Sequence, residues 1–494
     1  VINALHGRLE FDEADFLYPS FPKYTMFGLG KLVLALGYGD WEVSWAARLL
    51  SVILGAGVVV LTYSIARLSG VTVGFSVLAA LLVFTNSVLA QNARFAHNDI
   101  YLTLFVLLAT WASLRYAQTE QRGWFYLGCF MVGLAASSKY NGIALLLLPL
   151  ALFFIFTTRK QPSRDQLSQV ETLILGLILT GLGYALGTPK ALLWMTFYFK
   201  RMIPAFLNQA SYGLRPDSIP GFMGQWGLLT SVLSTPVVVL ALIAFAYALY
   251  RLVQVSQNKG WGNSTPRLVL PMAIIAIDLP IMLSYNYVAR YFLPLLPLLA
   301  VLIGQLAEHL NDWLRKQGWR LGRSILVSGL AGVLVYSFLR VIGVMLLFEN
   351  DARRSASEFL DQLPAASSAE YTFYPPNINR EIFTRAYTYP LFFVKWPGET
   401  PPTDQRFEYN TGATGVADRQ PDYLIIDSFT YERFQDPFIC ESILAECEFF
   451  TDLLAGKTDY VLIGNFEYDL PAWMPAMPRS FLNPDIRVYQ RGIP

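Results

Sequence analysis

Residues 91–142 read QNARFAHNDIYLTLFVLLATWASLRYAQTEQRGWFYLGCFMVGLAASSKYNG and contain two apolar runs, each joined to polar residues at one end. Asp99 begins the first run, and Lys139 ends the second. Two successive apolar spans cross a bilayer in opposite directions, so the chain returns to the side that it left. The sequence therefore predicts that Asp99 and Lys139 meet at one membrane surface.

The composition indicates an integral membrane protein. Of the 494 residues, 54% are hydrophobic and only 15% are charged, and the net charge is +1. Soluble domains contain about 25% charged residues, which excludes an ordinary soluble fold. The chain also lacks the strong positive charge of a nucleic-acid-binding protein, so we expect the lipid bilayer and no nucleic acid as a partner.

Apolar stretches of about 20 residues are long enough to span a bilayer. By this criterion the chain is a polytopic α-helical membrane protein. Its ten predicted spans are 44–68, 71–90, 99–117, 123–139, 141–158, 170–188, 227–250, 268–286, 290–309 and 324–348. The short, glycine-rich segment 24–38 is better explained by a helix that lies in the membrane interface.

The distribution of Lys and Arg sets the expected orientation, because cytoplasmic loops carry an excess of these residues. One set of alternate loops contains Arg67, Arg115, Arg122, Arg159, Lys160, Arg164, Arg251, Lys259, Arg267, Arg315, Lys316, Arg320 and Arg323. The short loops of the other set contain Arg94, Lys139 and Arg290. The first set is predicted to be cytoplasmic, which places the Asp99 surface outside. Because residues 1–43 are then also outside, we expect one more span upstream of Val1.

Residues 351–494 contain no further span and many acidic residues and prolines. Two runs have the apolar pattern of strands, YLIIDSF at 423–429 and YVLIGNF at 460–466. Residues 351–363 have the pattern of an amphipathic helix. These features predict an extracytoplasmic α/β domain that follows a transmembrane domain at residues 1–350.

Three cysteines are present. Cys129 lies in an apolar run and is expected to be a small core residue. On one continuous helix, Cys440 and Cys447 would have Cα atoms roughly 10 Å apart, too far for a disulfide. A bridge therefore needs an irregular segment between them. An extracytoplasmic location favours the bridge, and two free thiols are the alternative.

Asp99 is the candidate catalytic residue. A carboxylate at the outer end of a span can act as a base for an acceptor hydroxyl or amine, or can bind a cation. The alternative is a helix N-cap, in which Asn98 or Asp99 accepts hydrogen bonds from free backbone N–H groups. The polar side chains of Arg94, His97 and Lys139 at the same surface support the functional interpretation.

Lys139 is the first candidate for binding a phosphate, and its alternative role is to extend its ammonium group to lipid headgroups. Lys23, in the proline-rich turn YPSFPKYTMF, is a second candidate, for which an anionic-lipid anchor is the alternative. The full set of candidate substrate- and phosphate-binding residues is Lys23, Arg94, His97, Lys139, Tyr140, Asn141 and Arg290. The three histidines are scattered and no metal-ligand spacing occurs, so no metal site is predicted.

Asp278 lies near the middle of a predicted span, between Pro271 and Pro280. A charge at that depth costs at least about 2.5 kcal/mol, so this side chain is expected to be protonated or paired inside the bundle. A structural polar anchor and a functional group both fit the pattern.

Five segments, in this order, resemble the GT-C glycosyltransferases. The similarity is to the bacterial branch of glycosyltransferase family 39, which includes PMT-type protein mannosyltransferases and aminoarabinose transferases. The segments cover parts of residues 1–350 and are YPSFPKYTMF (18–27), WAARLLSVILG (45–55), NARFAHNDIYLTLF (92–105), GLAASSKYNGIALLLLPLAL (133–152) and ARYFLPLLPLLAVL (289–302). The C-terminal region resembles an extracytoplasmic domain that some members carry.

The resemblance implies a polyprenyl-phosphate-linked sugar donor at the outer face of a bacterial inner membrane. A hexosyl or pentosyl group would pass to a protein, lipid or glycan acceptor, and a divalent cation is compatible with this chemistry but not required. Asp99 matches the acidic residue of the family's second loop. Lys23 and Lys139 match lysines that would hold the lipid phosphate.

The family's first-loop acidic residue, its general base, precedes the position of Val1. Asp12, Glu13 and Asp15 lie beyond the place where it belongs. This departure leaves open a second class of function, a non-catalytic GT-C-like subunit that acts as a scaffold in a larger membrane complex. A secondary transporter is a third class, for which Asp278 is the only hint, since no internal repeat is visible.

Overall fold

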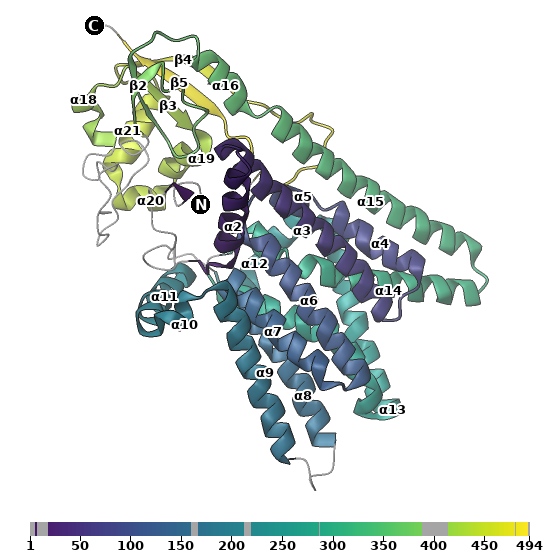
Figure 1. Cartoon of the computed structure of the whole chain (residues 1–494). Coiled ribbons are helices and arrows are strands. Elements are labelled where there is room, and N and C mark those ends of the chain that lie inside the picture. Colours follow the sequence, from purple (N-terminus) through teal and green to yellow (C-terminus); the bar gives the residue numbers. More distant parts are fainter. Residues whose placement is uncertain are drawn as a thin grey trace. The chain divides into compact units, whose positions relative to one another are not determined.

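A computed structural model describes residues 5–6, 18–159, 166–211, 219–285, 287–387, 413–479 and 481–492. The chain forms two compact units. The first consists of Val1–Val341 with Pro475–Pro478, and the second of Ile342–Met474 with Arg479–Pro494. The first unit is a bundle of helices, and the second contains a sheet with helices packed on it (Figure 1).

The helices of the bundle follow the predicted apolar runs closely. They are α2 (Phe21–Ala35), α3 (Asp40–Leu68), α4 (Val73–Phe84), α5 (Ser87–Arg94), α6 (Asn98–Thr119), α7 (Arg122–Ser138), α8 (Leu147–Arg159), α9 (Gln166–Gly187), α10 (Lys190–Leu193), α11 (Met195–Ser211), α12 (Gly221–Leu233), α13 (Thr235–Leu283), α14 (Leu295–Lys316) and α15 (Arg320–Glu349). Two short 3₁₀ helices, η1 (Tyr140–Leu146) and η2 (Ala289–Phe292), precede α8 and α14. The last residues of α15 belong to the second unit.

Seven helical segments of the described residues are long and apolar enough to cross a membrane, or eight if the bent pair α4 and α5 forms one span. Two predicted spans do not meet this criterion. Helix α7 has only 17 residues, and the second half of α14 is polar and charged. The number of ten spans therefore stays a prediction.

The two predicted spans at 227–250 and 268–286 belong largely to one helix, α13, and helical turns continue through the loop expected between them. Sixteen residues of a straight helix would separate Arg251 and Arg267 by about 24 Å. Both residues nevertheless line one cavity, so the axis of α13 bends sharply between them. The expectation of a loop was wrong, because helical hydrogen bonding persists through the reversal.

Helices α6, α7 and α9 pack side by side, with α7 between the other two. Glycine permits the close approach of α7 and α9. A Cβ atom on Gly133 would overlap the carbonyl oxygen of Thr180, and one on Gly183 would overlap the carbonyl oxygen of Phe130. Such small residues let helix backbones come together in a membrane, where packing rather than the hydrophobic effect drives association. This packing fixes the end of α7, which carries Lys139.

The second unit contains a five-stranded sheet with the order β2-β1-β3-β5-β4. Its strands are β1 (Ser367–Tyr371), β2 (Phe383–Tyr387), β3 (Tyr423–Asp427), β4 (Tyr460–Phe466) and β5 (Ile486–Arg491). The pairs β1–β2 and β1–β3 are parallel, whereas β5 runs antiparallel to β3 and β4. The helices of this unit are α16 (Ala352–Leu360), α18 (Val416–Arg419), α19 (Ser428–Tyr431), α20 (Pro437–Ser442) and α21 (Leu444–Leu454), with the 3₁₀ helices η3 (Ala413–Gly415) and η4 (Glu432–Gln435).

Alternation along β3 builds an apolar core on each face of this sheet. Leu424 and Ile426 join a cluster that includes Phe450 of α21. Ile425 joins a second cluster that includes Leu360 of α16. Because successive side chains of a strand point to opposite faces, one apolar strand supports both helical layers. The predicted helix near 351–363 and the strands near 423–429 and 460–466 are thus confirmed.

A disulfide joins Cys440 and Cys447, whose Cα atoms are 5.6 Å apart. The helices α20 and α21 are interrupted at Ile443, which has φ −144° and ψ 50°. This break supplies the irregular segment that the bridge requires. Cys129 is a buried free thiol in the core of the bundle, as expected.

Candidate functional site

Helix α6 starts at Asn98, and its N-cap is His97, whose Nδ1 lies 3.5 Å from the backbone nitrogen of Asp99. Asp99 is therefore the second residue of the helix. Its carboxylate is bonded to other side chains, so the N-cap interpretation of Asn98 or Asp99 was wrong. A carboxylate in the first turn still interacts favourably with the helix dipole.

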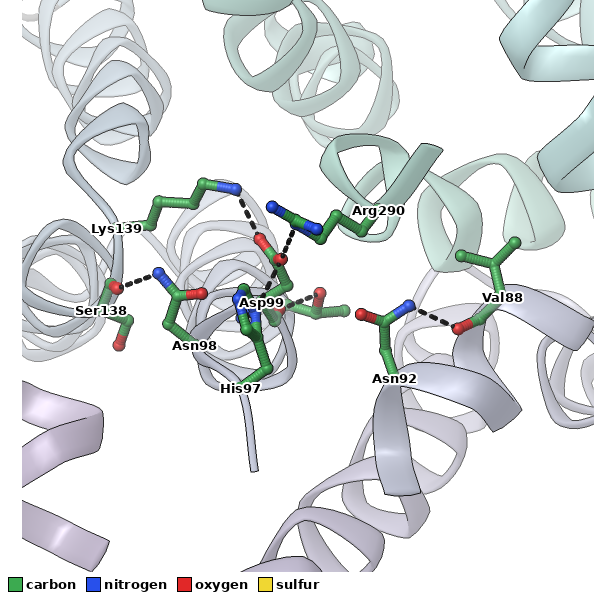
Figure 2. Close-up of polar contacts among 9 residues, drawn as sticks. Val88, Asn92, His97, Asn98, Asp99, Ser138, Lys139 and Arg290 are labelled. Carbon is green, nitrogen blue, oxygen red and sulfur yellow. Dashed lines mark hydrogen bonds and ion pairs between the residues drawn. The ribbon is translucent and has the colours of Figure 1, made fainter. Parts of the chain in front are cut away.

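The Asp99 carboxylate is fully buried and lies among three basic side chains (Figure 2). Its Oδ1 accepts a hydrogen bond from Nζ of Lys139 at 2.6 Å. Its Oδ2 lies 3.0 Å from Nδ1 of His97 and 3.3 Å from Nε of Arg290. Residues from three distant parts of the chain thus meet at one carboxylate. The predicted meeting of Asp99 and Lys139 is confirmed.

Lys139 follows the last residue of α7 and turns its side chain inward. The side chain is only 11% exposed, and Nζ lies 3.6 Å from the centroid of the Tyr291 ring. A cation above an aromatic face is stabilised by the ring quadrupole. An ammonium group that contacts both Asp99 and Tyr291 does not extend to headgroups, so that alternative was wrong.

Asn98, the first residue of α6, links this helix to the end of α7, because its Nδ2 donates a hydrogen bond to the carbonyl oxygen of Ser138 at 3.4 Å (Figure 2). Ser138 immediately precedes Lys139. The start of α6 and the end of α7 are therefore held together by a neutral hydrogen bond as well as by the ion pair.

The balance of charge in this cluster favours an anion. A buried carboxylate is stable only when it is paired, and Asp99 is paired with Lys139 and Arg290. Among the described residues, the cluster contains one carboxylate and the basic side chains of His97, Lys139 and Arg290. The cluster can therefore accept a phosphate or another anionic group beside the arginine and lysine heads.

Lys23 and Arg94 do not pair with Asp99. Lys23 lies in the first turn of α2, and Arg94 is the exposed last residue of α5. The turn that carries Lys23 nevertheless packs on α6, because Thr25 donates a hydrogen bond to the Tyr101 hydroxyl at 3.1 Å. The structure thus brings the proline-rich turn to the helix of Asp99 without joining Lys23 to the cluster.

Tyr140 points to a chain of phenolic hydroxyl groups. Its oxygen lies 3.1 Å from that of Tyr198 in α11, which lies 2.5 Å from that of Tyr184 in α9. Tyr198 is fully buried. Asn141 has a buried side-chain oxygen that accepts no hydrogen bond from the described residues. Tyr140 therefore anchors α11 next to Lys139.

Asp278 is buried in the bundle, with Oδ2 3.4 Å from Nε2 of Gln225. The pairing inside the bundle expected for this carboxyl group is therefore present. The two residues line a small apolar cavity of about 170 Å³ between α12, α13 and α14.

Sequence reasoning missed the aromatic part of the site. Tyr291 lies beneath Lys139 and Tyr198 lies beside Tyr140, and neither was among the predicted site residues. Tyr291 is next to Arg290, and Tyr198 lies in the run FYFKRM at 197–202, but no spacing rule indicates which ring faces a cation.

The donor set of the cluster does not suit a metal ion. Among the described residues no group of three or more His, Cys, Asp and Glu side chains could hold one. Asp99 is surrounded by cations, which would repel a further positive charge.

Residues 29–183 match the family model for dolichyl-phosphate-mannose-protein mannosyltransferases. No curated protein matches the sequence. The fold is similar to that of ArnT from Cupriavidus metallidurans in the apo state, with 15% identity, 98% of this chain and 88% of that chain covered, and a TM-score of 0.50. The structure of the same ArnT bound to undecaprenyl phosphate gives 14% identity, coverage of 98% and 89%, and a TM-score of 0.48.

The family match includes Asp99 and Lys139, and the fold similarity extends over nearly the whole chain. Together with the arrangement of apolar helices and a small α/β unit, these findings agree with the five sequence segments described above. The chain therefore contains a segment that matches the family model for PMT-type mannosyltransferases, and its fold is similar to that of ArnT.

Proposed function

We propose that this protein is a glycosyltransferase that moves a sugar from a polyprenyl-phosphate-linked donor to an acceptor. The reaction takes place at the membrane surface where Asp99, Lys139 and Arg290 meet. The observation that carries this proposal is the buried cluster itself, in which Lys139 and Arg290 both pair with the carboxylate of Asp99. The family model, whose members use dolichyl-phosphate-mannose by their description, supports the class of donor.

The chemistry requires stabilisation of a phosphate leaving group. When the bond between the sugar and the phosphate oxygen breaks, its electron pair stays with the phosphate. Cations fixed near that oxygen stabilise the developing charge without further reorganisation. Lys139 and Arg290 perform this role, with Arg290 suited to a bidentate contact with phosphate oxygens.

Asp99 acts through these cations as a positioning residue. The carboxylate lies 2.6 Å from an ammonium group and 3.3 Å from a guanidinium group, so it is already paired with both side chains. It aligns them and lowers their mutual repulsion. Deprotonation of the acceptor then falls to another group, and Asp12, Glu13 and Asp15 lie outside the described residues.

The acceptor is a hydroxyl or amine of a protein, lipid or glycan, and the transferred group is a hexosyl or pentosyl unit. The pattern of Lys and Arg in the loops supports an extracytoplasmic site in a bacterial inner membrane, with the α/β domain on the same side. That domain is then a candidate to bind acceptor.

The test is transfer of labelled sugar from a panel of polyprenyl-phosphate sugars in membranes that contain the protein. Asp99→Asn and Lys139→Ala are expected to lower transfer at least 100-fold at unchanged protein level. Lys190→Ala is the matched control, because Lys190 also lies over an aromatic ring, that of Trp194, but outside the cluster. Absence of transfer from every donor, by parent and variants alike, would favour a scaffold subunit instead.

A further inference from the structure

A second polar cavity lies at the opposite ends of the bundle helices. It has a volume of about 610 Å³ and is lined by the ends of α3, α6 and α14 and by both halves of α13. Its residues include Leu68, the last of α3, and Gln118, next to the last of α6. Nineteen residues of helix separate Gln118 from Asp99, which is about 28 Å at 1.5 Å per residue. The cavity therefore lies at the membrane face opposite the Asp99 cluster, the face predicted to be cytoplasmic.

Two arginines converge in this cavity. Arg251 and Arg267 come from the two halves of α13, and the sharp bend of that helix brings them together. Neither forms an ion pair with another residue that the structure describes. The Tyr247 hydroxyl lies near enough to interact with both, and its ring packs on that of His309 at a centroid distance of 5.0 Å. The guanidinium groups therefore lie near the Tyr247 hydroxyl.

Two carboxylates also line the cavity, and each already has a different partner. Both oxygens of Glu308 accept from the backbone N–H of Thr72, at 3.1 and 3.2 Å, ahead of α4. Asp312 pairs with Arg315 at 3.4 Å. The cavity therefore presents positive and negative groups that do not neutralise each other by direct contact.

We propose that this cavity binds a phosphate ester that carries a primary ammonium group, the chemistry of a phosphoethanolamine headgroup. Arg251 and Arg267 hold the phosphate oxygens, since guanidinium and phosphate match in bidentate geometry. The ammonium group donates hydrogen bonds toward Glu308 and Asp312. The volume lies in the range of small-ligand sites, roughly 300–1,000 Å³. The cavity is at the end of the membrane spans, where a phospholipid headgroup of that leaflet is at hand.

Because Glu308 and Asp312 accept hydrogen bonds from the ammonium group, the site prefers headgroups with N–H donors and a positive charge. A quaternary choline group has no N–H to donate, and a glycerol headgroup has no positive charge. Phosphatidylethanolamine is therefore favoured over both phosphatidylcholine and phosphatidylglycerol. The site is independent of the sugar-transfer chemistry, because it shares no residue with the Asp99 cluster.

The test uses the purified full chain, stripped of lipid, and native mass spectrometry with each of these three phospholipids. Inorganic phosphate and O-phosphoethanolamine are titrated in parallel to distinguish a lipid from a soluble source. We expect Arg251→Gln with Arg267→Gln to weaken phosphatidylethanolamine binding at least tenfold. Arg320→Gln, which removes an exposed charge at the start of α15, is the matched control and is expected to change nothing.

Glu308→Gln separates recognition from folding, because glutamine retains an oxygen that can accept from Thr72. Because Asp312 remains, this variant is expected to lose part of the preference for phosphatidylethanolamine over phosphatidylglycerol, and a parental preference would contradict the role of Glu308. Arginine-dependent binding of the lipid alone would assign the ligand to the membrane, and comparable binding of O-phosphoethanolamine would assign it to solution; both support the site. Binding of every probe at parental affinity in the double arginine variant would overturn it.

Discussion

The position of Asp99 in the sequence predicted part of its environment in the structure. If both apolar runs cross the bilayer, a carboxylate at the start of the first and a lysine at the end of the second lie on the same side of it. The distance of 2.6 Å between them could not be foreseen, because it depends on the packing of α6 against α7. Tyr291 was missed for the same reason, since an aromatic residue in an apolar run gives no sign of its orientation.

The hydroxyl chain of Tyr140, Tyr198 and Tyr184 can be tested at the residue scale. Tyr198→Phe keeps the buried ring but removes the central hydroxyl group, which leaves the half-buried hydroxyl groups of Tyr140 and Tyr184 with fewer hydrogen bonds. A buried polar group that loses its partner costs about 1–3 kcal/mol. We expect a lower thermal unfolding temperature, whereas Tyr126→Phe, in which no such chain is broken, is expected to leave it unchanged. Equal unfolding temperatures for Tyr198→Phe and the parent would contradict the importance of this chain.

Asp485 in the α/β unit provides a pH-dependent test. Burial raises the pKa of its carboxyl group, and the nearby Glu467 and Asp469 raise it further. A raised pKa means that the folded state binds the proton more tightly than the unfolded chain, so its contribution to stability is present at low pH and is lost as the pH rises through the folded pKa.

At neutral pH the folded protein bears the free-energy cost of an ionised carboxylate at position 485, and Asp485→Asn removes this cost. Hydrogen exchange of the β3 and β5 amides in the full chain is therefore expected to be slower than in the parent at pH 7.5 and similar at pH 4. Asp452→Asn, at a half-exposed carboxylate of α21, serves as the control. Equal hydrogen-exchange protection in Asp485→Asn and the parent at pH 7.5 would show that ionisation of Asp485 does not destabilise the folded state.

Among the secondary-structure elements, apolar patterns predicted the positions of most helices and of two strands. They did not predict which strands pair or which helices are continuous. Strands β3 and β4 were predicted because their sequences are rich in apolar and aromatic residues. The first two strands, SSAEY and FTRAY, were not, since their residues gain strand structure from pairing with β3 and with each other. Likewise, the loop expected within α13 is helical. Helix α7 is shorter than an ordinary span, and α14 is too polar in its second half.

The contact between α7 and α9 gives a prediction for elements. Gly133→Ala inserts a methyl group against the backbone of α9, which must move apart from α7. Overpacking of this kind costs typically 1–3 kcal/mol. We expect a lower thermal unfolding temperature and, because α7 positions Lys139, reduced sugar transfer. Gly123→Ala, on the same helix with open space around its Cβ position, is expected to resemble the parent. Similar behaviour of the two variants would rule out close packing as the role of Gly133.

At the scale of the whole molecule, the sequence predicted a membrane bundle followed by an α/β domain, and the structure contains one unit of each kind. Composition and patterning suffice for this, because a bilayer demands long apolar helices and an aqueous domain does not. The convergence of residues 97–99, 139 and 290 was expected only in outline, since it depends on tertiary packing along almost 200 residues of chain. No sequence pattern predicted the bend in α13 or the cavity beside it.

The most direct test of the central claim is equilibrium binding of a polyprenyl phosphate to the purified full chain in nanodiscs, as a function of salt. If Lys139 and Arg290 hold the lipid phosphate, Lys139→Met and Arg290→Gln will each weaken binding at least tenfold and flatten its salt dependence. Lys190→Met will bind like the parent. Parental affinity in both cluster variants would contradict a phosphate site at Asp99, and the cluster would then be only a structural ion pair.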